Sequence, residues 1–158
     1  MTDIVDKKTR SRMMSGIQGK DTRPELIVRK ALHRRGYRYK LHDKALPGKP
    51  DLVFPKYKAV IQVNGCFWHK HNCHIFKWPK SREDFWKQKI MGNAERDKKQ
   101  LLELENMGWR VLIVWECCFK GKTRLPFDDC IDSIEYWIKN GTCSTELYGI
   151  EQGNLDKQ

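Results

Sequence analysis

Metal-binding side chains are concentrated in one short stretch, Gly65–His74, and this concentration constrains the fold more than any other feature of the chain. The stretch follows a largely apolar run, 59–63, and its ligand-type residues are separated by two adjacent aromatic residues, Phe67 and Trp68. An element built only for packing would not alternate thiols, imidazoles and aromatic rings. We therefore predict a metal-tied loop at the end of a strand, with the candidate ligands Cys66, His69, His71, Cys73 and His74.

The length of 158 residues predicts a single domain. Such a chain buries about two-thirds of its unfolded surface, so it does not need metal merely to form a core. No run approaches the ~18 apolar residues of a membrane span, and Met1–Lys20 lacks the apolar centre of a signal peptide. We expect a cytoplasmic protein, whose six cysteines bind metal or remain thiols.

The charge balance is strongly basic, with 31 lysines and arginines against 20 acidic residues and a net charge of +11. A cytoplasmic protein with this excess is typically a partner of a polyanion, and nucleic acid is the first candidate. The alternative is a basic surface that only keeps the protein soluble. Six tryptophans favour nucleic acid, because bases stack on flat rings.

The first half of the chain predicts one helix followed by three strands. Thr22 has the character of an N-cap, Glu25 that of its capping-box partner, and Gly36 ends the helix. Three short apolar or alternating runs then predict strands, and a Pro-Gly-Lys-Pro sequence predicts a turn before the second of them. The expected strands are 37–42, 51–54 and 58–63.

The second half predicts helix, strand and helix. A second capping signature at Ser81–Asp84 opens a helix to Met107, with an interruption near Gly92. The run 109–115 is almost continuously apolar, which indicates a central strand buried on both faces. A helix over 126–140 follows, and residues 141–158 are expected to form a tail. The order α-β-β-β-α-β-α predicts an α/β fold, a mixed central sheet flanked by helices, as in restriction-endonuclease-like nucleases.

Within the ligand-rich loop, a fourth zinc ligand has to come from elsewhere in the chain. Cys117 lies just after the strand 109–115, and it reaches the loop if that strand is a parallel neighbour of the one ending at Val63. Four protein ligands would make a closed, structural zinc site. His69, His74 and Cys118 remain alternatives for the fourth position, and a loop without metal is the competing interpretation.

Acidic residues supply a second candidate site. Hydrolysis of a phosphodiester requires a hard cation such as Mg²⁺ and an activated water, and Mg²⁺ prefers carboxylate oxygens. Asp51, Glu25 and Asp97 are the candidates, although each has a structural alternative as a turn cap, a helix cap or a solvated helix residue. His69 would then be available to act on the attacking water.

The motifs as a whole resemble one family, the very short patch repair (Vsr) mismatch endonucleases, which have the restriction-endonuclease-like fold. The resemblance is nearly colinear from Asp6 to Lys120. Its most specific parts are the box Gly-Cys-Phe-Trp-His at 65–69 and the ending Trp-Glu-Cys at 115–117. Further matches are Leu-Pro-Gly-x-Pro-Asp at 46–51 and Asn-x-Glu-Arg-Asp at 93–97.

The resemblance implies a Mg²⁺-dependent nicking endonuclease that cuts 5′ of the thymine in T·G mismatches left by deamination of 5-methylcytosine. By position, Asp51 and the backbone carbonyl of Val63 would bind Mg²⁺, while His69 and Glu25 organise water, with Asp97 and Asn64 in the same catalytic set. Cys66, His71, Cys73 and Cys117 would hold zinc. Phe67, Trp68, Trp86 and Met14 would contact DNA, the three aromatic residues as wedges between base pairs.

Two departures from the family pattern concern the strand that ends at Asn64. Family members commonly have histidine at that position, and the nuclease superfamily often has an acidic residue where Gln62 stands. These departures leave open a zinc-stabilised DNA-binding protein with impaired catalysis. A restriction-type endonuclease on unmismatched duplex, with the same fold, is the other alternative.

The expected organisation is an N-terminal DNA-contacting arm (1–20), an endonuclease domain (21–140) and the tail. A bacterial monomer acting at the nucleoid is expected, because one asymmetric lesion needs one nick. Assistance from mismatch-repair proteins and the identity of the flanking bases stay open.

Overall fold

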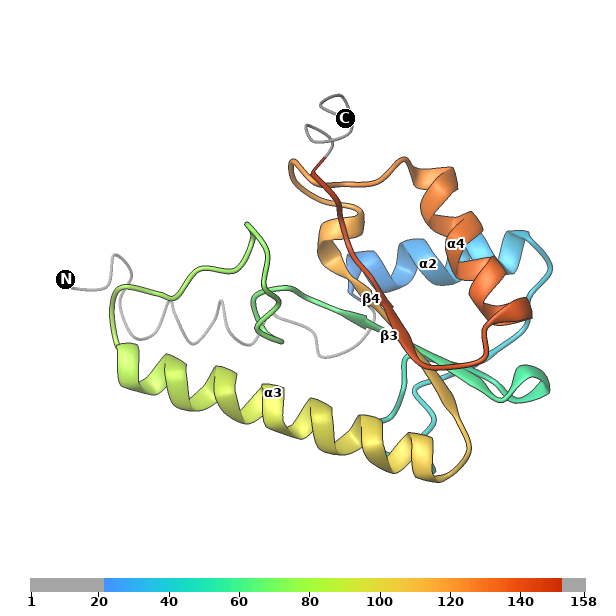
Figure 1. Cartoon of the computed structure of the whole chain (residues 1–158), viewed down its shortest axis with the longest axis horizontal. Helices are drawn as coiled ribbons and strands as arrows, with labels where there is room; N and C mark the ends of the chain where they lie inside the picture. Colours follow the sequence, from blue (N-terminus) through green and yellow to red (C-terminus); the bar gives the residue numbers. More distant parts are fainter. Residues whose placement is uncertain (1–21, 152–158) are drawn as a thin grey trace.

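The computed structural model describes residues 22–151, and this part of the chain forms three α-helices around a five-stranded sheet (Figure 1). Two short 3₁₀ turns follow strand ends, at Pro55–Tyr57 and Glu116–Cys118. The helices are α2 (Arg23–Arg34), α3 (Glu83–Asn106) and α4 (Phe127–Asn140), and the strands are β1 (Lys40–Leu41), β2 (Leu52–Phe54), β3 (Ala59–Asn64), β4 (Arg110–Trp115) and β5 (Thr145–Leu147).

The sheet is mixed, as predicted, with the strands in chain order from β1 to β5. The first three strands pair antiparallel, whereas β4 runs parallel to both β3 and β5. The register places Asn64 opposite Trp115 at the carboxyl ends of β3 and β4. The condition under which Cys117 reaches the ligand-rich loop, that these two strands are parallel neighbours, is therefore met.

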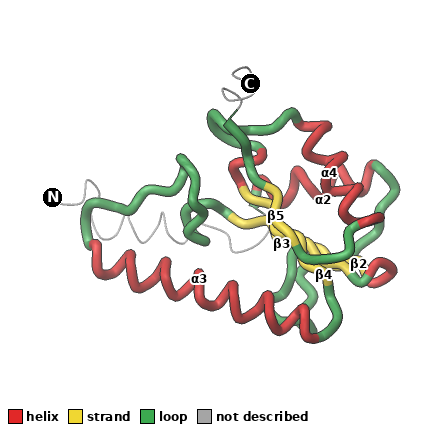
Figure 2. Tube along the Cα trace, viewed as in Figure 1, coloured by secondary structure: helices red, strands yellow, loops and turns green. Residues whose placement is uncertain are grey.

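Helices cover the two faces of the sheet unequally: α2 and α4 lie on one face and α3 lies on the other (Figures 1 and 2). The alternation of side chains along β3 separates two cores. Ile61 faces the larger core together with Leu32 of α2 and Ile134 of α4. Val60 belongs to the smaller core with Leu104 of α3.

The N-terminal half of α3 extends beyond the sheet, and the segment 65–82 runs beside it (Figure 1). The amide of Asn93 donates a hydrogen bond to the Trp68 carbonyl at 3.1 Å, and Ile90 is fully buried. The helix and the ligand-rich loop therefore form one projecting unit. None of the helices within residues 22–151 is long and apolar enough to cross a membrane.

The expected element order lacked one strand. Residues 145–147 lie in the segment expected to be a tail, yet they pair with Leu112–Val114 of β4. The predicted central strand, 109–115, does have a neighbouring strand on each side, but it is the second strand from the edge of the sheet. The central strand is β3. The predicted first strand, 37–42, is shorter, because only Lys40–Leu41 pair with β2.

The helix starts also differ from prediction. Thr22 occupies the N-cap of α2 as expected, but its side chain makes no capping hydrogen bond, so the capping box with Glu25 is wrong. The N-cap of α3 is Arg82, in the left-handed region at φ 53°, and it too makes no side-chain cap. The helix α3 continues through Gly92 without the expected interruption.

Candidate active site and metal centre

A cluster of four ligand-type side chains joins the loop after β3 to the end of β4. The ligand atoms of Cys66, His71, Cys73 and Cys117 all lie within 4.8 Å of one another. His71 Nδ1 is 3.5 Å from the Cys66 sulfur and 3.6 Å from the Cys117 sulfur. A tetrahedral zinc bound to sulfur and imidazole nitrogen separates those two atoms by roughly 3.6 Å. The donor set and spacing therefore fit a closed zinc site.

The surroundings of this cluster favour the thiolate form of Cys117 and hold the His71 ring in one orientation. The His71 ring stacks on Trp115, with ring centroids 4.2 Å apart and planes at 9°. The Cys117 sulfur accepts a hydrogen bond from the Cys66 thiol and a second one from the Gly149 amide, whose nitrogen is 3.2 Å away. These bonds lower the pKa of Cys117 to about 5, while the same pairing and burial raise the pKa of Cys66. Because Cys66 and Cys117 share one proton between their sulfur atoms, a bound cation can readily displace it.

The alternatives for the fourth ligand are not part of this cluster. The Cys118 thiol donates to the Leu147 carbonyl at 3.2 Å instead, so it secures β5. His69 pairs with Asp97, and His74 packs against Gly121. Cys117 is therefore the residue that completes the group, as the resemblance implied.

A second cluster contains Glu25 of α2, His42 after β1 and Asp51 before β2. His42 Nε2 lies 3.1 Å from both carboxylate oxygens of Glu25 and 3.8 Å from Asp51 Oδ1. The other oxygen of Asp51 accepts a hydrogen bond from the Val63 amide at 2.8 Å. Arg29 donates to Glu25 Oε2 at 3.0 Å. The Glu25 side chain thus faces this site.

The two carboxylates are held where water screens them poorly. Burial raises the pKa of Asp51 from its ordinary value of 3.8 to about 7, and the nearby Glu25 carboxylate adds to the rise. The Val63 amide opposes it by donating to the ionised form. A buried carboxyl group beside a second carboxylate is a suitable site for a divalent cation, which neutralises both.

His42 is the site residue that the sequence interpretation missed. The signal was present in the expected hairpin: in an antiparallel pair of strands 37–42 and 51–54, position 42 comes opposite position 51. The His42 amide does donate to the Asp51 carbonyl, at 3.2 Å. The pairing brings the His42 imidazole to the Asp51 carboxylate.

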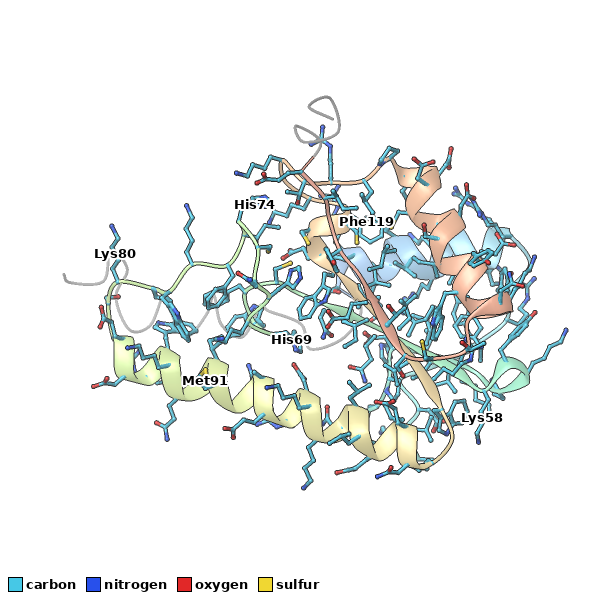
Figure 3. All side chains as sticks on the ribbon, in the orientation of Figure 1. Lys58, His69, His74, Lys80, Met91 and Phe119 are labelled. Atoms are coloured by element: carbon cyan, nitrogen blue, oxygen red, sulfur yellow. The ribbon has the colours of Figure 1, made fainter. Side chains whose placement is uncertain are left out.

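A third group is the pair formed by His69 of the loop and Asp97 of α3, and Figure 3 shows His69 on the side of the loop that faces α3. His69 Nδ1 lies 2.6 Å from Asp97 Oδ2. In a neutral imidazole whose Nδ1–H donates to the carboxylate, Nε2 is left as a proton acceptor. The predicted alternative for Asp97, a solvated helix residue, does not describe this contact.

One cleft of about 400 Å³ connects the second cluster to this pair. Six predicted site residues line it, and buried Asn64 is among them. Val63 is held in place there by its bond to Asp51. The lining residues are Thr22, Glu25, His42, Gly48, Lys49, Asp51, Gln62, Val63, Asn64, His69, Asp97 and Gln100.

The predicted DNA-contacting aromatic residues form one contiguous group. The Phe67 ring contacts Trp68 and Trp86 at centroid distances of 5.1 and 5.5 Å, and the two tryptophans are 5.9 Å apart. All three are half-buried. The group continues into three further rings that sequence reasoning did not single out as DNA contacts: Phe76, Trp78 and Phe85. Met14 and the expected arm at 1–20 lie outside the described residues.

Comparison with known proteins gives a consistent result. The family model for DNA mismatch endonuclease Vsr matches residues 2–75. The DNA mismatch endonuclease Vsr of Escherichia coli K12 is 41% identical over 147 residues, covering 93% of this chain and 94% of that protein. The type II nicking enzyme V.NmeAIP of Neisseria meningitidis is 49% identical over 77% of this chain and 87% of its own. The type II nicking enzyme V.XorIIP of Xanthomonas oryzae is also 49% identical, over 74% and 86%.

Proposed function

The chain belongs to the Vsr family of DNA mismatch endonucleases, and on this basis we propose that it nicks T·G-mismatched DNA 5′ of the thymine, after deamination of 5-methylcytosine. The observation that carries the proposal is the cleft shared by Glu25, Asp51 and the His69–Asp97 pair. It combines a cation-binding carboxylate cluster with an oriented proton acceptor, which are the two parts that phosphodiester hydrolysis needs.

His69 is the proposed general base. Asp97 fixes the ring orientation and stabilises the imidazolium that forms when Nε2 takes the proton of the attacking water. His69 lies between the zinc-ligand candidates Cys66 and His71, and the His71 amide closes the loop by donating to the Cys66 carbonyl at 2.9 Å. Zinc at the cluster would therefore hold the base in place without touching substrate.

Asp51, Glu25 and the Val63 carbonyl are the proposed holders of Mg²⁺, whose chemistry is to neutralise the phosphoryl oxygens. Asn64 is buried and lines the cleft, and its amide can hydrogen-bond water or phosphate but cannot take up a proton. The proton chemistry therefore rests on His69.

The aromatic group is proposed to open the helix at the mismatch. Trp68 and Phe67 stand in the same loop as His69, and Trp86 faces them from α3. Inserting rings between base pairs costs a few kcal/mol per unstacked step, and a wobble pair reduces that cost. Recognition and cleavage are thereby coupled through one rigid loop.

The test is a nicking assay on three labelled duplexes: T·G at a methyltransferase site, C·G at the same site, and T·G with the flanking bases scrambled. We expect a Mg²⁺-dependent nick 5′ of the thymine in the first. Cutting of both strands, or equal nicking of T·G and C·G, would contradict the proposal. The same series with and without added mismatch-repair proteins reads out whether they assist, and sedimentation reads out whether the enzyme is a monomer.

A restriction-type endonuclease on unmismatched duplex is the second candidate, because several relatives are named type II nicking enzymes. Those names specify nicking, which favours a single-strand product over a double-strand break. Binding of T·G duplex without any cleavage would instead select the third hypothesis, a zinc-stabilised DNA-binding protein.

A further inference from the structure

The cation cluster contains a nitrogen ligand candidate, His42, that the proposed mechanism does not use. Its side chain is 20% exposed, and its Nε2 atom lies against Glu25 and Asp51. Among the histidines of the described chain, only this one shares a possible metal-binding group with the two catalytic carboxylates.

The arrangement of the donors directs specific atoms toward one point. Arg29 bonds to Glu25 Oε2 and the Val63 amide bonds to Asp51 Oδ2. His42 Nε2 lies 3.1 Å from both oxygens of Glu25, of which Oε1 has no bond to Arg29, and 3.8 Å from Asp51 Oδ1. Two ligands at ~2.1 Å from one octahedral ion are about 3.0 Å apart when adjacent and about 4.2 Å apart when opposite. The 3.1 Å separation matches adjacent ligands, and the 3.8 Å separation lies between the two values, so a small shift of the Asp51 side chain would place all three donors around one ion.

The backbone also holds the imidazole at this point. His42 has a φ of 46°, in the left-handed region that few residues other than glycine adopt. Its amide donates to the Asp51 carbonyl, which ties the residue to the strand that carries the carboxylate.

We propose that His42 is a direct ligand of the catalytic cation, bound through Nε2 with the ring proton on Nδ1. The site would then have one nitrogen donor beside the two carboxylates and the Val63 carbonyl. Mg²⁺ is a hard ion that prefers oxygen donors, whereas transition-metal ions such as Mn²⁺ accept imidazole nitrogen. The site is therefore expected to bind Mn²⁺ more tightly relative to Mg²⁺ than an all-oxygen site would. The inference rests on the proposed cation site but not on T·G specificity.

The test is electron spin-echo envelope modulation of Mn²⁺ bound to the zinc-loaded full chain without DNA, which detects ligated nitrogen directly. The informative variant is His42→Asn, because asparagine tolerates the left-handed conformation and offers an amide oxygen in place of the ring nitrogen. The matched control is His33→Asn, an exposed histidine of α2. Isothermal titration with Mn²⁺ and Mg²⁺ gives the affinities, and zinc content and thermal unfolding confirm the fold.

We expect nitrogen modulation in the wild type and in His33→Asn, and its loss in His42→Asn. The Mn²⁺ affinity of His42→Asn should fall about tenfold, with Mg²⁺ affinity changed by less than about threefold. Modulation that persists in His42→Asn, modulation absent from the wild type, or failure of Mn²⁺ to bind would each overturn the inference. Nicking of T·G duplex is measured in parallel: normal nicking without nitrogen modulation refutes His42 ligation alone, whereas modulation without nicking refutes the proposed function alone.

Discussion

The Asp51 carboxylate should destabilise the protein when no divalent cation is bound, and replacing it should stabilise the fold while abolishing nicking. Folding raises the pKa of Asp51 from 3.8 to about 7, so the folded state holds a proton that the unfolded chain releases over this interval. Stability is therefore lost as the pH rises from about 4 to about 7. Asp51→Asn removes this loss, and its side-chain oxygen can still accept from the Val63 amide.

The size of the effect follows from the same pKa. Each pH unit across the interval corresponds to about 1.4 kcal/mol, which gives an upper bound of about 4 kcal/mol. The side chain retains 18% exposure and shares its proton with Glu25, so we expect about half of that, ~2 kcal/mol. For a chain of this length such a gain raises Tm by about 4–8 °C.

The assay is thermal unfolding of the zinc-loaded protein at pH 8 and pH 5, in chelator-free buffer without Mg²⁺. The variant should be more stable at pH 8, with a clearly smaller difference at pH 5. Mg²⁺ at about 100 times its Kd should stabilise the wild type by about 2.7 kcal/mol and leave the variant nearly unchanged. Glu105→Gln, an exposed site on α3, is the control and should shift Tm by less than about 1 °C. Equal or lower stability of Asp51→Asn at pH 8 would refute the argument.

Four further predictions concern the other parts of the site. Cys117→Ser should lose bound zinc and several kcal/mol of stability by elemental analysis and denaturant unfolding, while the exposed Cys143→Ser changes neither; retention of zinc would show that the cluster is misassigned. Asp97→Asn should slow single-turnover nicking by about 10- to 100-fold with mismatch affinity unchanged, because a charge-assisted hydrogen bond is worth about 1.5–3 kcal/mol; an unaltered rate would remove Asp97 from the mechanism. Trp68→Ala should weaken the preference for T·G over C·G by about tenfold or more in fluorescence anisotropy, and full discrimination in this variant would make the rings core residues. The logarithm of DNA affinity should fall with the logarithm of salt concentration with a slope near −7, for roughly eight neutralised phosphates, and a slope shallower than about −2 would contradict the basic-surface argument.

The local sequence determined the features that depend on neighbouring residues. The apolar runs specified the cores of β2, β3 and β4, because burial of side chains on both faces selects continuous apolar segments. Three zinc-ligand candidates fall within Cys66–Cys73, where the short chain between them keeps the sulfur and nitrogen atoms close. Asp51, His69 and Glu25 could be proposed from their motifs, although the capping box expected for Glu25 lacks the hydrogen bond of the Thr22 side chain.

Tertiary structure decided the features that depend on distant partners. The parallel pairing of β3 with β4 selected Cys117 over His74 and Cys118, because it brings the two strand ends together. The short strand β5 has little apolar signal of its own and exists because β4 offers it an edge for hydrogen bonding. Gly92 lowers helix propensity by about 1 kcal/mol, a local cost that packing of α3 against the loop and sheet outweighs. The hairpin register could indicate that His42 lies beside Asp51, but only the packing of α2 against the sheet adds Glu25 to the group, a proximity that no local pattern encodes.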